Sequence, residues 1–241
     1  MNYRLLSSVI ALSCMSASFS ANAETVFRPR VSLGFSKYEL AFTQSGDSLS
    51  SVTYLKGGIG ATIANGQLYF DAGYSGSLGA KYDDGLVPDQ DFLRNDLTLT
   101  IGYVLQNNIT VFGGYKSGTT EYTDWLSVDT TTKFEASGPY FGAGIGVPAG
   151  GGVLSFNGAI AILSADLTDN DPNLTQFNAS ADSVGVSLGL GYSMTFGGTS
   201  GLAFKGSVQA YNYTGWTDPN YLIDDTKETI VSFDVEYYYN F

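Results

Sequence analysis

Residues 231–241 read VSFDVEYYYNF, and an apolar or aromatic side chain occupies every second position of this stretch. A period of two is typical of a β-strand with one apolar face, because successive side chains of a strand point to opposite sides. One face would carry Val231, Phe233, Val235, Tyr237, Tyr239 and Phe241. Asp234 and Glu236 would lie on the other face. The stretch therefore predicts an amphipathic strand that ends at Phe241.

The same alternation recurs along the chain. It is clearest in residues 183–196, SVGVSLGLGYSMTF, and is repeated in residues 67–78 and 95–105. Soluble β-sandwiches also alternate, but here the polar face is small and rich in Gly and Ser. Aromatic side chains gather near strand ends, as in the girdles at both interfaces of outer-membrane barrels. The segments are also about as long as a tilted membrane strand. These features favour a transmembrane β-barrel.

The alternation predicts ten strands in an all-β, closed antiparallel barrel. Their expected ranges are 27–40, 51–63, 67–80, 94–105, 109–120, 133–147, 152–165, 182–196, 201–214 and 228–241. Eight strands is the alternative, since 27–40 and 109–120 alternate least clearly. A sheet edge cannot remain open in lipid, where every backbone polar group must be paired. We therefore expect strand 228–241 to pair with strand 27–40.

The connections between these strands alternate in length. Four are short and rich in Gly, Asn and Pro, which is typical of tight turns, and they cover residues 64–66, 106–108, 148–151 and 197–200. Five are longer and cover residues 41–50, 81–93, 121–132, 166–181 and 215–227. Short periplasmic turns and long extracellular loops are the pattern of single-chain outer-membrane barrels. Both chain termini would then lie in the periplasm.

The first 23 residues have the features of a cleaved signal peptide. Arg4 supplies the positive charge, an apolar segment follows, and Ala21-Asn22-Ala23 is a cleavage site of the A-x-A type. We therefore expect residues 24–241 to form a single barrel domain. Cys14, the one cysteine of the sequence, falls within the expected signal peptide, so no disulfide is expected in the mature protein.

Composition excludes several classes of function. The sequence contains no His, so a His-based catalytic triad is ruled out. With no Cys expected after cleavage, the usual transition-metal ligands and the thiol nucleophile are missing as well. The formal net charge of −12 would repel nucleic acid phosphates. We expect no cofactor, no catalytic residue and no nucleic acid partner.

At this level the chain resembles the small outer-membrane barrel superfamily, which includes OmpA-like, OmpX-like and opacity-type proteins. The resemblance covers the expected mature chain and is architectural. Its most specific element is the terminal strand, which is similar to the signal read by the barrel-assembly machinery at positions Phe233, Val235, Tyr237, Tyr239 and Phe241. It implies export with periplasmic chaperones and a place in the outer membrane. The ten-strand count is also that of omptin proteases, but their active site uses His.

The predicted lumen contains charges of both signs. The alternation turns nine of them inward, namely Arg28, Arg30, Lys56, Asp71, Asp96, Lys116, Lys205, Asp234 and Glu236. Charges in a narrow, partly dry space must be paired, so we favour a network of ion pairs that fills the interior. A pore lining or a small polar ligand site is the alternative.

The expected loops are rich in acidic residues. Oxygen ligands suit Ca²⁺, and the weak candidates are Asp83, Asp84, Asp224 and Asp225, although none of these runs has the spacing of an EF-hand. Glu228, the first residue of the expected strand 228–241, is counted with the acids of the last loop. Trp216 lies among these acids and is expected at the membrane interface or at an adhesive tip.

These observations leave three functional hypotheses. The first is a non-enzymatic surface barrel with a structural, adhesive or protective role, which displays acidic loops to a host or surface ligand and contacts membrane lipid and lipopolysaccharide. The second is a narrow porin-like channel or a binding barrel for a small solute. The third is a His-free enzyme that uses loop carboxylates, and we expect no activity that depends on them.

Overall fold

A computed structural model describes residues 25–43, 48–82, 90–105, 108–123, 130–170, 177–218 and 224–241. The expected signal peptide, residues 1–23, lies outside the described residues. Within these ranges, no helix is long and apolar enough to cross a membrane.

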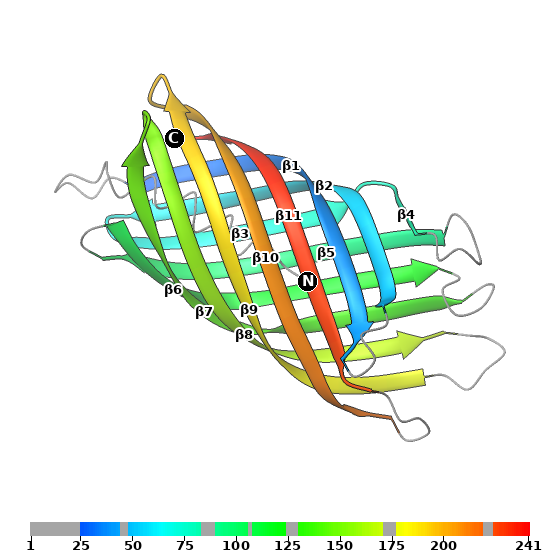
Figure 1. Ribbon diagram of the computed structural model, residues 1–241. Helices are drawn as coiled ribbons and strands as arrows, with labels where there is room; N and C mark the ends of the chain where they lie inside the picture. The colour runs from blue at the N-terminus through cyan, green and yellow to red at the C-terminus, as the bar shows by residue number, and fades with distance from the viewer. Residues whose placement is uncertain are drawn as a thin grey trace.

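The described chain is almost entirely β-strand (Figure 1). Its strands are β1 (Thr25–Phe42), β2 (Ser48–Asn65), β3 (Leu68–Ser77), β4 (Ala80–Tyr82), β5 (Gln90–Val104), β6 (Ile109–Thr123), β7 (Thr131–Ala149), β8 (Gly152–Asp169), β9 (Phe177–Phe196), β10 (Ser200–Thr217) and β11 (Thr226–Tyr239). Both β3 and β4 pair with β5, and the break between them contains Gly79 at a φ of 61°. They therefore form one side of a closed antiparallel barrel of ten strands. The ten-strand prediction is confirmed, and the eight-strand alternative is wrong.

The barrel closes where its first and last strands meet. β1 and β11 pair antiparallel from Arg30 opposite Tyr238 to Phe42 opposite Thr226. Phe241 extends this seam, because its N–H donates to the carbonyl oxygen of Phe27 at 2.9 Å. The two rings also pack with centroids 6.1 Å apart. The pairing expected from the need to satisfy every backbone group is confirmed.

Deleting Phe241 should impair barrel assembly, because it removes the last backbone hydrogen bonds of the seam and the aromatic contact with Phe27. The expected result is loss of the heat-modifiable band on gels of outer-membrane fractions, with the protein recovered as a periplasmic aggregate. Phe241→Tyr, which keeps the ring and the backbone, is the matched control and should assemble. Normal heat-modifiable protein after the deletion would show that the terminal residue is dispensable.

The two ends of the barrel differ. The end called here the turn end carries the short connections after β2, β5, β7 and β9 and both termini of the described chain (Figure 1). The opposite end is called the loop end. Strands extend further toward the loop end than expected, so that residues 166–169 belong to β8 and residues 177–181 to β9. The long connections are therefore shorter than the sequence alternation predicted.

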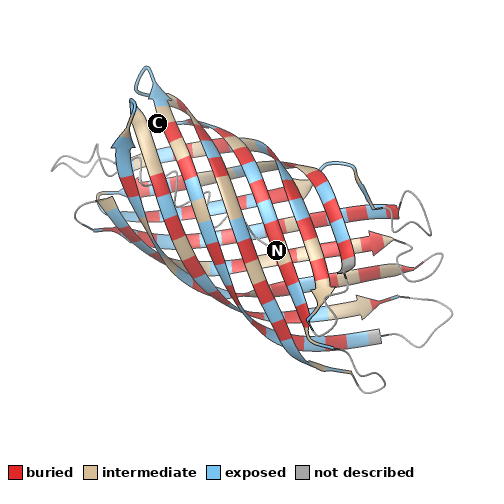
Figure 2. Ribbon diagram, in the orientation of Figure 1, coloured by how far each residue is buried: buried red, intermediate tan, exposed pale blue. Residues whose placement is uncertain are grey.

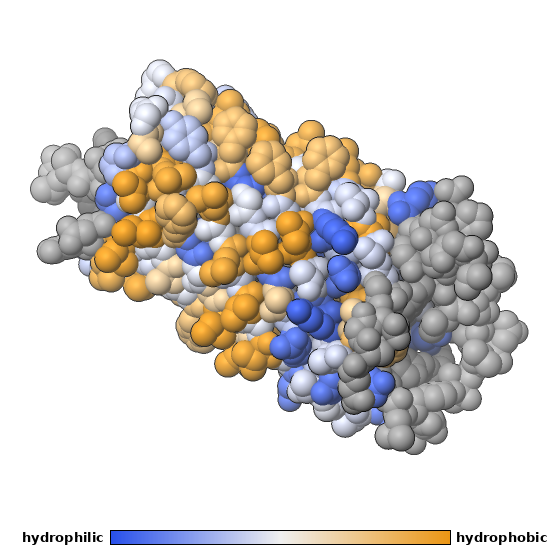
Figure 3. Space-filling model, viewed as in Figure 1, coloured by the Kyte–Doolittle hydropathy of each residue, from blue (hydrophilic) through white to orange (hydrophobic). Residues whose placement is uncertain are grey.

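Outward and inward side chains alternate along every strand, as Figure 2 shows. Toward the turn end the outward side chains are large and apolar, and together they form the apolar belt; its members include Val31, Phe35, Ile59, Phe70, Leu99, Phe141, Ile160, Leu188, Val208 and Phe233. Toward the loop end the outward side chains become polar and form the collar; its members include Lys37, Glu39, Asn95, Ser117, Glu121, Lys133, Glu135, Asp166, Asp182 and Lys227. Figure 3 shows this change of polarity along one side of the barrel.

Tyrosines mark the edges of the apolar belt. Near the collar, the hydroxyl of Tyr74 donates to Asn95 Oδ1 at 2.7 Å. At the turn end, the Tyr192 hydroxyl donates to the Gly150 carbonyl oxygen at 3.1 Å. A strand of 18 residues such as β1, tilted by about 45°, rises roughly 40 Å, whereas the apolar band of a membrane barrel is about 25 Å tall. The collar is the part of the wall that extends beyond such a band.

Candidate functional site in the barrel lumen

All nine charged residues assigned to the lumen lie inside the barrel and are buried. Four of them form a cluster toward the turn end. Arg30 Nη1 lies 2.6 Å from Asp71 Oδ1, and Arg30 Nε lies 3.3 Å from Glu236 Oε2. Lys205 Nζ lies 2.8 Å from the same Glu236 oxygen. Because β1, β3, β10 and β11 supply these groups, the cluster links several strands of the wall.

Two further cations have separate partners. Lys56 Nζ lies 2.8 Å from Asp234 Oδ2, with both side chains almost completely buried. Arg28 Nε donates to Asn240 Oδ1 at 2.6 Å, and the guanidinium carbon lies 4.4 Å from the centre of the Tyr238 ring. Burial without a partner would cost each of these cations several kcal/mol, so the pairing explains how they are tolerated.

A second cluster, centred on Arg94, was not assigned from the sequence. Arg94 is fully buried; its Nε lies 3.2 Å from Asp96 Oδ1 and its Nη1 lies 2.9 Å from Glu228 Oε1. Tyr213 donates its hydroxyl proton to Glu228 Oε2 at 2.8 Å. The assignment of Glu228 to an acidic loop is wrong, because β11 begins at Thr226 and turns Glu228 inward. Arg94 lies on the same strand face as Asp96, and Glu228 lies on the same strand face as Asp234. The period of two could therefore have identified Arg94 and Glu228 as inward-facing.

Two contacts join strands that have three other strands between them in the wall, and we call them the cross-lumen ties. The Arg94–Glu228 ion pair links β5 to β11, although β1, β2 and β3 lie between them in the wall. Lys116 on β6 donates to the hydroxyl of Tyr211 on β10, and that hydroxyl donates to Gln209 Oε1 at 2.8 Å. Side chains therefore reach across the interior from opposite walls.

Toward the loop end the interior becomes aromatic. We call this set the aromatic plug, and its members are Tyr38, Tyr54, Phe92, Tyr122, Phe134, Tyr213 and Trp216. Phe92 lies at its centre, with ring centroids 5.8 Å from Tyr38, 5.2 Å from Tyr54 and 5.4 Å from Tyr122. Ring separations in this range are favourable. The collar thus has a polar outside and an apolar inside, the reverse of the belt.

Trp216 belongs to this plug and not to an exposed tip, which corrects the expectation from its acidic neighbours. The pairing of β10 with β9 shifts register between Thr214 and Thr217, and Gly215 within the shift has a φ of 69°. A bulge of this kind redirects a side chain. The Trp216 ring consequently packs against Phe134, with centroids 6.3 Å apart.

Inward aromatic rings outside the plug, several of them close to the turn end, lie against glycines on the neighbouring strand. In each pair the two residues are direct partners in the sheet, and a Cβ on the glycine would overlap the ring; the pairs are Tyr69 with Gly102, Phe112 with Gly142, Tyr140 with Gly114, Tyr211 with Gly185 and Tyr238 with Gly201. Glycine on the predicted inner face thus makes room for a ring that fills the lumen.

Gly185→Val should displace Tyr211 and break its contact with Lys116, because the added side chain occupies the position of the ring. Overpacking of this kind costs about 1–3 kcal/mol, measured as a loss in the free energy of unfolding in urea. Gly206→Ala is the matched control, since its Cβ would meet nothing within 4 Å. Equal stability of the two variants would argue against close packing in the lumen.

The calcium candidates are only partly described. Asp83 and Asp84 lie outside the described residues. Asp224 is exposed at the loop end, and Asp225 Oδ1 accepts a hydrogen bond from the Gly215 N–H at 3.1 Å. Within the part of the chain that the structure describes, no three acidic side chains are grouped closely enough to hold a metal ion.

Several solved structures resemble this barrel. The outer membrane protease OmpT from Escherichia coli superposes with a TM-score of 0.65 at 10% identity, over 93% of this chain and 99% of that chain. The chain has the fold of a ten-stranded outer-membrane β-barrel. The toluene transporter TodX of Pseudomonas putida gives a TM-score of 0.39 at 10% identity, over 99% of this chain and 93% of that chain. Neisserial surface protein A gives a TM-score of 0.38 at 10% identity, over 87% of this chain and 95% of that chain.

No protein-family model matches the chain, and no curated protein sequence matches it. At 10% identity, the likeness to OmpT concerns the fold alone.

Proposed function

We propose that this chain is a closed barrel of the bacterial outer membrane that acts through its surface, without catalysis. The main support for this proposal is that side chains occupy the lumen. Two ion-pair clusters, the cross-lumen ties and the aromatic plug occupy the interior, and the largest inward side chains, such as Arg94, Tyr140 and Tyr213, are less than 2% exposed. A barrel of eight to ten strands has little interior space to begin with.

The apolar belt supports the membrane location. Side chains such as Leu188, Ile59 and Phe141 are each more than 60% exposed on the outside of the barrel. So wide a band of exposed apolar surface is unfavourable in water and is satisfied by lipid. In this orientation the turn end faces the periplasm, the collar contacts lipopolysaccharide, and the long connections are displayed to a host or surface ligand. The barrel-assembly machinery and periplasmic chaperones would act during biogenesis.

Replacing the long connections by two-residue Asn-Gly turns tests the surface role, since strand pairing reaches the loop end without them. The trimmed barrel should assemble, as judged by heat-modifiability, yet fail to restore surface adhesion or envelope integrity in cells that lack the gene. Full restoration by the trimmed barrel would indicate that the function depends on the wall or the lumen and not on the long connections.

A further inference from the structure

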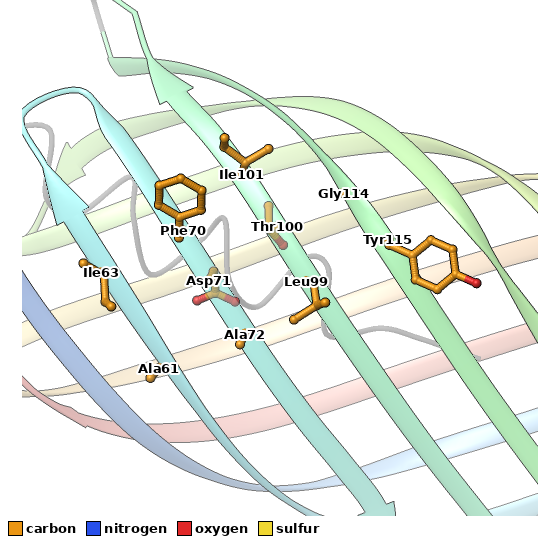
Figure 4. Close-up of a pocket in the computed structure, with 10 residues that line it drawn as sticks. All are labelled: Ala61, Ile63, Phe70, Asp71, Ala72, Leu99, Thr100, Ile101, Gly114 and Tyr115. Carbon is orange, nitrogen blue, oxygen red and sulfur yellow. The ribbon is translucent and has the colours of Figure 1, made fainter.

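The apolar belt is hollowed by a groove on the outer wall of β2, β3, β5 and β6, with a volume of about 560 Å³ (Figure 4). Its floor is made by Ala61 and Ala72, which are direct partners across β2 and β3. Both side chains end at Cβ, so the wall is thin at this point. The groove lies in the part of the belt nearer the turn end.

Larger side chains border this floor. Ile63 on β2, Phe70 on β3 and Ile101 on β5 are partners in consecutive strands and form one side of the groove. Tyr115 on β6 forms the far end, where its hydroxyl donates to Ser137 Oγ at 3.0 Å and so keeps the ring in place. In Figure 4, Ile63, Phe70 and Ile101 lie on one side of the two alanines, and Leu99 lies between the alanines and Tyr115.

The shape and chemistry of the groove suit a hydrocarbon chain. From β2 to β6 it crosses three strand spacings, which is about 14 Å. The side chains that border it on the lipid side are aliphatic or aromatic, and they are continuous with the belt that contacts lipid. Pockets of roughly 300–1,000 Å³ hold small ligands, so the volume accommodates one acyl chain.

We propose that this groove binds one acyl chain of a phospholipid from the leaflet at the turn end. The proposal rests on the outer-membrane location proposed above, in which that leaflet is periplasmic. Lipid tails are as apolar as the groove, so the hydrophobic effect gives no preference for the site over bulk lipid. Retention comes instead from close packing of the chain against two alanines and a rigid rim.

The test measures lipid retained by the purified, folded barrel. The wild-type barrel in mild detergent is incubated with dipalmitoyl phosphatidylethanolamine and examined by native mass spectrometry. The expected result is one retained lipid per barrel. Ala72→Leu combined with Ala61→Leu fills the groove and should abolish this adduct. The matched control is Ala210→Leu. Ala210 is a small residue on the outer face of β10, on another side of the barrel, and this variant should keep the lipid adduct.

Phe70→Ala provides a second variant, which removes one border and should weaken retention without filling the floor. Heat-modifiability shows that each variant is folded. Equal retention by the filled and control variants would overturn the proposal, as would a lipopolysaccharide adduct or a dimer in place of the phospholipid adduct. Membrane fractionation separates the two proposals: a barrel absent from the outer membrane contradicts the location, whereas a correctly located barrel without the adduct contradicts only the groove.

Discussion

Arg94→Met should lower the free energy of unfolding of the barrel by about 3–5 kcal/mol, because it leaves two buried carboxylates, Asp96 and Glu228, without the cation between them. The methionine is close to arginine in length, so the loss of charge dominates over the loss of volume. Urea titration of the protein folded into lipid vesicles measures the effect.

Two variants show whether charge is the cause. Combining Arg94→Met with Asp96→Asn and Glu228→Gln removes the uncompensated charges and should recover most of the lost stability. Lys133→Met breaks an exposed pair with Glu135, in which the two atoms lie 3.0 Å apart, and should cost at most about 1 kcal/mol. A loss at Arg94 no larger than the loss at Lys133 would mean that the lumen is hydrated.

Leu188→Lys should cost about 2–4 kcal/mol, because Leu188 projects from the apolar belt and is 67% exposed on the outside of the barrel. Val184→Lys on the same strand lies next to the collar and should cost about 0–1 kcal/mol. Asp182→Lys, within the collar, should be close to neutral. Unfolding titrations in vesicles of defined lipid give this depth series.

The same series contains its own control. Leu188→Ala removes apolar area without adding charge, so the difference between the alanine and lysine variants isolates the cost of placing a charge in lipid. A flat series, with equal costs at Leu188 and Asp182, would show that the belt does not mark the membrane.

The half of the barrel that carries the apolar belt could be predicted from the sequence, because the two faces of its strands differ strongly in polarity. Residues 183–196 alternate large apolar side chains with Gly and Ser, and the structure turns the first set outward. The pairing of strand 228–241 with strand 27–40 followed from the need to close the sheet, without any knowledge of side-chain contacts.

The strand segments of the collar could not be predicted in the same way, because their polar side chains face outward and their apolar side chains face inward. In residues 165–169, Ala165 and Leu167 face inward while Asp166 and Thr168 face outward. This stretch has the period of a strand, but its acids suggested a loop. Glu228 was misassigned for the same reason, since an acid next to a loop was taken as part of it. The inward position of the Trp216 ring depends on a bulge at Gly215, and a sequence pattern of period two does not reveal such a bulge.

The closed lumen is the central claim, and planar-bilayer recording of the purified wild-type barrel tests it most directly. The ties from Arg94 to Glu228 and from Lys116 to Tyr211 cross the interior, and the aromatic plug lies toward its loop end. We expect no stable conductance steps in neutral salt, while a known porin in the same bilayers gives them. Reproducible steps of a single size from the wild-type barrel would contradict the account.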